Sequence, residues 1–473
     1  MKRQVVALLV AAAIIGGACA ADGADDAADK DRPATTATPS GSEPTTPDGA
    51  QKFGSLDSPC GPSDTPATVK ADEAGTGTDK LYIGVGNDRT GIRPGLLKEL
   101  WDGATAFVGW CNSQGGINGL QLEAVDLNGE VLKVEDAMGK ACTSVFAIVG
   151  GGWAQDNFIF SGRDGTDFHR CKLIAIPGFA VSTDFAEATD QVQPLPNPSR
   201  VKPVASFESL AKLYPDQVAE YGVVFGNLPS ITQNKDQTIG TAKQVEGYGN
   251  FAEISYDIVN QDWASIVQQV IDKDLQALTF IGEPANFSKF SQALKDQGWD
   301  GLVTSETNQY DTRLLESSGP AAVEGVVVRS AFHPFEEADQ WPATKQLVEI
   351  LDEYVPDWQH AALAVQAFSA SLLFATVTKQ CADEGEISRE CVLTRAQQVH
   401  DWDAGGLHTS SDPGAGEPPA CSMLLQVKNG EWTRLFPEIG SDDDDGDGFS
   451  CAGTATLEGD FGQGNKTSSI LDG

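Results

Sequence analysis

Basic residues are scarce in this sequence, with 32 lysines and arginines against 68 aspartates and glutamates among 473 residues, a formal net charge of -36. Such a surface repels phosphate backbones and anionic membrane surfaces, so nucleic acid is not expected as a partner. The acidic excess also keeps an exported protein dispersed, and this explanation carries more weight than a specific acidic function. Catalytic signatures are missing too, because the sequence contains no GxSxG, HExxH or P-loop motif, which favours binding over catalysis.

Long apolar runs are equally few, and the clearest one lies at the N-terminus. The run Val5 to Ile15 follows two basic residues, precedes small residues and is too short to span a membrane comfortably, as in an export signal over residues 1–20. The sequence GGAC ending at Cys19 resembles a bacterial lipobox, although Gly stands where Leu is preferred. The overlapping Ala-Cys-Ala instead fits an ordinary cleavage site. A polar stretch follows that cannot form a core, so we predict a disordered tether over 21–78 and a lipid anchor at Cys19.

CxxC pairs are absent and the five histidines do not cluster, so the sequence gives little support to a zinc site. Without Cys19, eight cysteines remain, an even number that indicates disulfides in an oxidising compartment. The sequence alone leaves 105 pairings open for these residues: Cys60, Cys111, Cys142, Cys171, Cys381, Cys391, Cys421 and Cys451.

Short apolar strands alternate with helical patterns along the chain. In the segment SQGGINGLQLEAVDLN, two glycines end a helix, Asn118-Gly119 makes a turn and a strand begins. Strands are predicted at LYIGVG, VFAIVGGG, LIAIPG, GVVFGN and LTFIG, and a hairpin at MLLQVKNGEWTRLF. The run Ala361 to Val377 contains polar residues and is predicted to be a buried helix. The strand and helix order predicts an α/β fold with two lobes, each a mostly parallel sheet flanked by helices.

The order of several segments carries a family resemblance. GVGNDRTG, NSQGGINGLQLEAVDLN, LIAIPG, DWASIVQQVIDKDLQALTFIGEPANFSKFSQALKDQGWDG and LLQVKNGEW together resemble the type I periplasmic solute-binding proteins of ABC importers, of the leucine/isoleucine/valine-binding type. The resemblance covers roughly residues 80–436 and depends on order and spacing. It implies two hinged lobes joined by three crossover strands, with lobe I at 79–203 and 335–420, lobe II at 204–334 and 421–440, and an acidic C-terminal tail at 441–473.

The implied fold also favours particular disulfides and a ligand site. The favoured pairs are Cys142 with Cys171, Cys381 with Cys391 and Cys421 with Cys451, leaving Cys60 with Cys111. Ligands of open parallel sheets bind at the carboxyl ends of strands, so the candidate ligand-binding residues lie in those loops: Asp88, Arg89, Thr90, Trp153, Ala154, Gly178, Phe179, Asn227, Ser230, Glu283, Glu306 and Tyr310.

Arg89 could clamp a ligand anion or neutralise neighbouring acids. Glu306 stands where the family places the acid that holds a ligand ammonium, and an aromatic wall could be formed by Trp153, Phe179 and Tyr310. Each alternative stays open, because Glu306 could cap the next helix and the aromatic residues could be core packing. Ala154 and Ala180 stand where amino-acid binders of the family tend to place hydroxyl side chains, which disfavours an ordinary α-amino acid as ligand.

One acidic stretch, SDDDDGDGFSCAG, fits the start of a calcium loop. Asp443, Asp445 and Asp447 alternate before Gly448, but the twelfth position is Thr454 rather than a bidentate acid. Calcium and a solvated acidic linker therefore stay as alternatives, and no other cofactor is expected. The segment after residue 459 is predicted to be frayed.

The sequence predicts a non-enzymatic, monomeric, extracytoplasmic solute-binding lipoprotein that delivers a small polar solute, such as an amino acid or amide, to a membrane ABC permease. Its location would be the cell membrane, through the lipid anchor, or the periplasm or medium after ordinary cleavage. A clamshell receptor that senses its ligand without transport is an alternative. A calcium-structured surface protein is another.

Overall fold

The computed structural model describes residues 51–64, 67–70, 73–77, 79–162 and 165–472, which all belong to one compact unit, Pro44–Gly473. The predicted export signal, the anchor at Cys19 and tether residues 21–50 lie outside the described residues.

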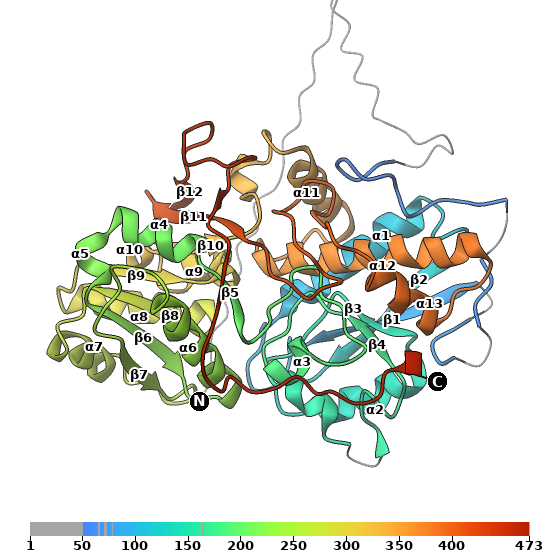
Figure 1. Ribbon diagram of the computed structural model, residues 1–473, viewed down its shortest axis with the longest axis horizontal. Helices are drawn as coiled ribbons and strands as arrows, with labels where there is room; N and C mark the ends of the chain where they lie inside the picture. The colour runs from blue at the N-terminus through green and yellow to red at the C-terminus, as the bar shows by residue number, and fades with distance from the viewer. Residues whose placement is uncertain (1–50, 65–66, 71–72, 78, 163–164, 473) are drawn as a thin grey trace, which may run out of the picture. The chain divides into compact units, whose positions relative to one another are not determined.

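Lobe I is built on a four-stranded parallel sheet with the order β2-β1-β3-β4, drawn in blue to green-cyan in Figure 1. Side chains of β3 alternate between its two faces: Ala147 and Val149 belong to the core formed with α1 and α12, and Ile148 belongs to the core formed with α2. Both faces are thus covered by helices. The elements of lobe I are β1 (Lys80–Asn87), α1 (Lys98–Ser113), β2 (Gln121–Asn128), α2 (Val134–Ser144), β3 (Ala147–Val149), η1 (Asp156–Phe160), β4 (Ile174–Ile176), α3 (Thr183–Ala186), η4 (Phe335–Glu337), α11 (Pro342–Tyr354), α12 (Ala362–Glu384) and α13 (Arg389–Ala396).

Lobe II is built on the larger sheet, with the order β12-β11-β10-β9-β8-β6-β7 and with β13 paired to β11. Strands β6 to β10 run parallel to their neighbours, and β10 pairs antiparallel with β11. Alternation again places Phe280 against α7 and α8, and Phe225 against α4 and α6. The elements of lobe II are α4 (Ala205–Leu213), α5 (Pro215–Val218), β6 (Tyr221–Gly226), α6 (Pro229–Ala242), β7 (Ala252–Tyr256), α7 (Trp263–Asp272), β8 (Ala277–Ile281), α8 (Pro284–Asp296), β9 (Leu302–Ser305), η3 (Thr307–Gln309), α9 (Thr312–Ser317), α10 (Pro320–Val323), β10 (Val327–Ser330), β11 (Cys421–Lys428), β12 (Glu431–Phe436) and β13 (Ser450–Cys451).

Several local predictions are confirmed. The helix ends before Gly115 and Gly116, and Asn118 and Gly119 form the turn with positive φ that leads into β2. Asn429 and Gly430, both with positive φ, connect β11 and β12 as the predicted hairpin. Among the described residues, α12 alone is long and apolar enough to cross a membrane, but most of it is buried inside the fold, as expected for a core helix.

Three crossing segments, at 191–204, 331–341 and 397–420, connect the lobes. They contact one another, since Phe332 forms a β-bridge with His408 and the Ser411 hydroxyl donates to the Pro194 carbonyl. His408 is completely buried and accepts a hydrogen bond at Nε2 from the Ser369 hydroxyl (2.9 Å), while Nδ1–H donates to the Thr409 carbonyl (2.9 Å). Burial lowers the pKa of His408 to about 4, so this histidine is neutral at physiological pH.

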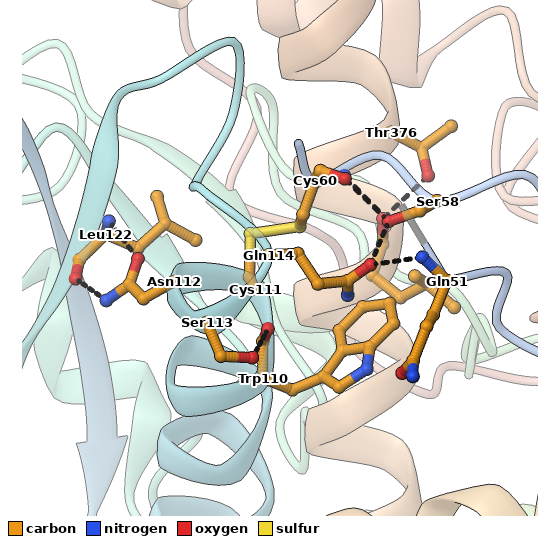
Figure 2. The surroundings of a disulfide bond; sticks show 11 residues. Gln51, Ser58, Cys60, Trp110, Cys111, Asn112, Ser113, Gln114, Leu122 and Thr376 are labelled. Carbon is orange, nitrogen blue, oxygen red and sulfur yellow. Dashed lines mark hydrogen bonds between the residues drawn. A yellow bond between two sulfur atoms is a disulfide. The ribbon is translucent and has the colours of Figure 1, made fainter. Parts of the chain in front are cut away.

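The predicted tether is wrong for its last part, where the described residues between 51 and 77 pack on lobe I. The Phe53 ring is fully buried against Trp110 and Phe368, and Cys60 forms a disulfide with Cys111 of α1. Figure 2 shows the Gln114 side chain beside this disulfide, where its Oε1 accepts hydrogen bonds from the Gln51 backbone N–H (2.9 Å) and from a serine hydroxyl. Composition alone predicted disorder here, but the buried ring, the disulfide and backbone hydrogen bonds such as that from the Lys70 N–H to the Ile387 carbonyl (2.9 Å) fix the segment.

The C-terminal residues are also ordered rather than frayed. We call residues 454–472 the strap; it contains β14 (Thr454–Thr456), which pairs with β5 (Val201–Pro203) of a crossing segment, and ends in η5 (Ile470–Asp472). Leu457 and Phe461 are buried and lie beside Gly240 of α6 in lobe II. The Asn465 N–H then donates to the Asp184 carbonyl in lobe I (2.9 Å). The strap, dark red in Figure 1, therefore contacts both lobes.

All four favoured disulfides are confirmed: Cys60–Cys111, Cys142–Cys171, Cys381–Cys391 and Cys421–Cys451. The first three lie within lobe I. The fourth joins β11 to β13 in lobe II, next to the start of the strap.

Candidate functional site

A cavity of about 660 Å³ lies between the lobes and is lined by both of them and by the crossing segments. This volume falls within the range of roughly 300–1,000 Å³ typical of small-molecule sites. Most of its lining is apolar, and the apolar residues come from each part of the molecule: Ile92, Leu96, Leu97, Val131, Phe179, Val181 and Leu363 from lobe I, Leu195, Pro196 and Phe332 from the crossing segments, and Phe207, Leu228, Ile231, Ile258, Val259, Phe280 and Ile281 from lobe II.

Two arginines on the cavity wall connect the lobes. Arg93, from lobe I, forms an ion pair with Glu283 of lobe II and donates to the Ile258 carbonyl (3.0 Å). Arg313, from lobe II, donates to Glu99 Oε1 (2.7 Å) and to the Gly95 carbonyl (2.7 Å) in lobe I. The lobes are thus held together across the cavity in this structure.

Glu99 and Arg313 form the more deeply buried of these contacts. Burial raises the pKa of Glu99 to about 7, against the opposing effect of the Arg313 charge. Arg313 also donates through Nε to Asp311 Oδ1 (3.0 Å), so a single guanidinium faces two buried carboxyl groups.

A third charged group lies at the carboxyl ends of β9 and β10. Arg329 donates through Nε to Glu306 Oε2 (2.7 Å), and Lys202, from a crossing segment, donates to Asn197 Oδ1 (2.6 Å). Burial lowers the pKa of Lys202 to about 7, while the Glu306 charge opposes that shift and the Arg329 charge adds to it. Two cations and one carboxylate therefore line this part of the cavity.

Of the predicted ligand-binding residues, Ala154, Phe179, Glu283 and Glu306 line the cavity. Their interactions differ from those predicted. Glu283 is paired with Arg93, and Glu306, predicted to hold a ligand ammonium, is already paired with Arg329. The Ala154 N–H donates to Asp88 Oδ2 (2.7 Å), so this backbone donor is used inside the protein.

The other predicted residues do not line this cavity. Asp88 follows β1, and its burial raises the pKa of its carboxyl group, against the opposing effect of the Val131 and Ala154 N–H groups that donate to it. Arg89 stacks on Trp101 and pairs with Asp126 (2.5 Å) within lobe I. Their neighbour Thr90 accepts a hydrogen bond from the Asn128 amide.

The predicted aromatic wall is not formed. Trp153 is fully buried in lobe I, where its Nε1–H donates to the Leu127 carbonyl (2.8 Å). Tyr310 is buried as well, and its hydroxyl donates to Glu336 Oε2 (2.6 Å). Phe179 is the predicted aromatic residue that does reach the cavity.

Three further predicted residues have structural contacts. Gly178 is packed so tightly that a Cβ atom would lie 2.5 Å from the Gly150 carbonyl oxygen. Asn227 accepts a hydrogen bond from the Ile258 N–H (3.2 Å) in lobe II. Ser230 donates across the lobes to the Ala154 carbonyl (3.3 Å).

The family comparison agrees with this architecture. The model of the periplasmic binding protein family matches residues 208–431, which span lobe II, the last two crossing segments and helices of lobe I. Residues 208–431 therefore match this family, and the chain as a whole shares its two-lobed α/β fold.

Solved structures of this fold resemble the chain over most of its length. A fatty acid ABC transporter substrate-binding protein from Thermomonospora curvata has a TM-score of 0.65 at 17% identity, covering 84% of this chain and 97% of that one. A leucine-binding protein from Thermotoga maritima has a TM-score of 0.61 at 17% identity (75% and 98%). A branched-chain amino acid transporter substrate-binding protein from Streptococcus pneumoniae, solved with isoleucine, has a TM-score of 0.59 at 15% identity (76% and 100%). No curated protein matches the sequence.

Sequence reasoning missed the cations that line the cavity, Arg93, Lys202, Arg313 and Arg329. One signal could have found Arg329, because it interrupts the apolar strand sequence VVVRS, and a charged residue in such a strand is rarely buried without a purpose. The other three follow no comparable pattern.

The predicted calcium residues have protein partners. Asp443 accepts from Lys212 Nζ (2.5 Å), Asp445 Oδ2 accepts from the Cys451 N–H (2.7 Å), and the Asp447 carbonyl accepts from His333 Nε2 (2.8 Å). Within the described ranges, no three His, Cys, Asp or Glu side chains gather as a metal site. Calcium binding by this loop stays a prediction.

Proposed function

We propose that this protein is an extracytoplasmic, lipid-anchored solute-binding protein that captures a small organic solute between its lobes and delivers it to an ABC importer. The observation that carries the proposal is the cavity, which is lined by both lobes and bordered by contacts that exist only when the lobes are close together. Of the similar proteins, one is named for a fatty acid, one is named for leucine, and one was solved with isoleucine bound. This fold therefore serves both apolar acids and amino acids. An amino acid, an amide or a related organic compound is the solute class for this chain.

The mechanism would be a shift in population between open and closed forms. A solute that touches both lobes stabilises the closed form in proportion to its additional contacts there, and the permease would recognise that form. No covalent step is needed.

A ligand screen tests the binding part of the proposal. Thermal unfolding of the mature protein is measured with amino acids, amides, organic acids and polyamines, and hits are checked by small-angle scattering. We expect at least one class to raise the Tm and to compact the particle. Ala154→Trp, which fills the cavity, should abolish the response, and the exposed Ala321→Trp should keep it. If no class changes either quantity, solute capture is contradicted.

Delivery and anchoring need cellular tests. Cells lacking the protein should lose uptake of the labelled solute, and the wild-type gene should restore it. A Cys19→Ser variant should move from the membrane fraction to the soluble fraction, because it removes the proposed lipidation site. Retention of this variant at the membrane would contradict the lipid anchor but not solute binding.

A further inference from the structure

The charged side chains on the cavity wall are not evenly balanced. Arg93 is matched by Glu283, and Arg313 faces Glu99 as well as a second acid. These two groups contain at least one carboxyl group for each arginine.

The group formed by Lys202, Arg329 and Glu306 differs, because it places two cations and one carboxylate on the cavity wall; Glu187, the other acid that acts on Lys202, is not among the lining residues. When all three are ionised, one positive charge is left over at the carboxyl ends of β9 and β10. This is the place on the cavity wall where an anion would be attracted rather than repelled.

One hydrogen-bond donor at this place also has no acceptor. Arg329 uses Nε for Glu306, but its Nη1 is buried and has no hydrogen-bond partner among the described residues. A buried guanidinium N–H without an acceptor destabilises a protein, and a ligand oxygen would remove that cost. Lys202 is only 8% exposed and lies close enough for its pKa to respond to the charge of Arg329.

The first turn of α4 supports the same polarity. Ser206 and Phe207 line the cavity beside Arg329, so the positive end of the helix dipole is directed toward this region. This contribution adds to the two cations and does not depend on them.

The rest of the cavity suits an apolar body rather than a second charge. Its wall is formed mainly by aliphatic and aromatic side chains of both lobes, and the acid predicted to hold an ammonium group, Glu306, is already engaged by Arg329. A zwitterionic amino acid would have to bury its ammonium without an available carboxylate.

We propose that the cavity binds an amphipathic monocarboxylate, whose carboxylate is held by Arg329 and Lys202 and whose apolar body, without an amino group, fills the space between the lobes. This inference rests on the proposed solute-binding function and specifies its substrate class.

Matched ligands test the class by isothermal titration calorimetry on the mature wild-type protein. The pairs are octanoate with octylamine and octanol, and 4-methylpentanoate with leucine, which differs by its amino group. We expect the carboxylates to bind at least tenfold more tightly than their partners. Tighter binding of leucine or octylamine overturns the inference and leaves solute capture intact, whereas failure of every ligand class in the wider screen contradicts the proposed function itself.

Two substitutions are expected to change the affinity for carboxylates in opposite directions. Arg329→Gln should weaken carboxylate binding tenfold or more. Glu306→Gln should strengthen it severalfold, because it releases Arg329 and removes a negative charge. If Glu306 held an ammonium group, the second variant would lose binding instead, which would overturn the inference. Lys345→Gln, an exposed lysine paired with Asp339, is the control and should bind as the wild type does.

The pH profile tests Lys202. Bound carboxylate favours the charged ammonium, so affinity should fall as pH rises from 7 to 9. The charged groups that act on Lys202 are Glu306, Arg329 and Glu187. Lys202→Gln should make the affinity independent of pH in this range. An unchanged pH profile would show that Lys202 does not hold the carboxylate. Circular dichroism and the unliganded Tm establish that each variant is folded.

Discussion

The ion pair between Arg93 and Glu283 provides a direct test of lobe closure. Arg93 belongs to lobe I, whereas Glu283 and its neighbouring acceptor, the Ile258 carbonyl, belong to lobe II. Replacing Arg93 with glutamine removes both contacts without changing either lobe's core. We therefore expect the variant to favour the open form.

The size of the effect follows from the exposure of the pair. The side chains are 28% and 19% exposed, so solvent screens them partly and the pair contributes roughly 0.5–1 kcal/mol. The hydrogen bond to the carbonyl adds about 1 kcal/mol. A total of roughly 1.5–2 kcal/mol changes the ratio of closed to open molecules about 10- to 30-fold. A protein that is mostly open without ligand should lose affinity by the same factor.

The assay combines calorimetric affinity with the radius of gyration of the unliganded protein. Arg89→Gln is the matched control, because Arg89 pairs with Asp126 inside lobe I and should leave both quantities unchanged. A double-mutant cycle with Glu283→Gln isolates the pair. The reasoning is refuted if Arg89→Gln and Arg93→Gln have equal effects, or if Arg93→Gln changes neither quantity.

Three further results are expected. The buried neutral His408 has a pKa of about 4 in the folded protein and near 6.5 in the unfolded chain, so its contribution to stability is lost as pH falls from 6.5 toward 4. Thermal unfolding should show that the wild type is about 2 kcal/mol less stable at pH 5 than at pH 7, and that His408→Gln lacks this loss. Equal pH dependence of the two proteins would contradict this expectation. Arg313→Met leaves the buried Glu99 without its partner and should lower the free energy of unfolding by about 3–5 kcal/mol, measured by urea titration. A loss below about 1 kcal/mol would show that the pair is not buried. Gly464→Ala places a Cβ atom 2.0 Å from the Glu187 carbonyl oxygen, so the substitution should detach the end of the strap and speed proteolysis of the strap. An unchanged cleavage rate would show that the contact at Gly464 does not hold the strap in place.

The fold could be predicted from the sequence because its signals are local and repeated. Central strands such as β6 and β8 are apolar runs in the sequence, and Asn429-Gly430 has the backbone conformation that its turn requires. Disorder was predicted wrongly where composition is polar but a single aromatic residue, Phe53 or Phe461, is buried against a lobe. Isolated aromatic residues in polar segments are the signal that could have corrected this prediction.

The site could be predicted only as a set of loops. A position at the end of a strand places the backbone near the cavity but does not fix where the side chain points. Trp153 is therefore buried in the core, whereas its neighbour Ala154 lines the cavity. Glu306 lies where expected, but its partner Arg329 comes from the next strand, 23 residues away. Pairings of this kind depend on strand register, which the sequence does not state.

The attachment of both described ends of the chain to lobe I has a consequence for motion. The first described residues are fixed there by the disulfide at Cys60, and the last ones by Asp190, which accepts hydrogen bonds from Ser469 and Ile470. A membrane anchor upstream of Cys60 would therefore be joined to lobe I, and closure would move lobe II relative to the anchored lobe. A dye at Asp472, the last described residue, should keep its distance from lobe I during closure, whereas a dye at the exposed Val259 of lobe II should change its distance.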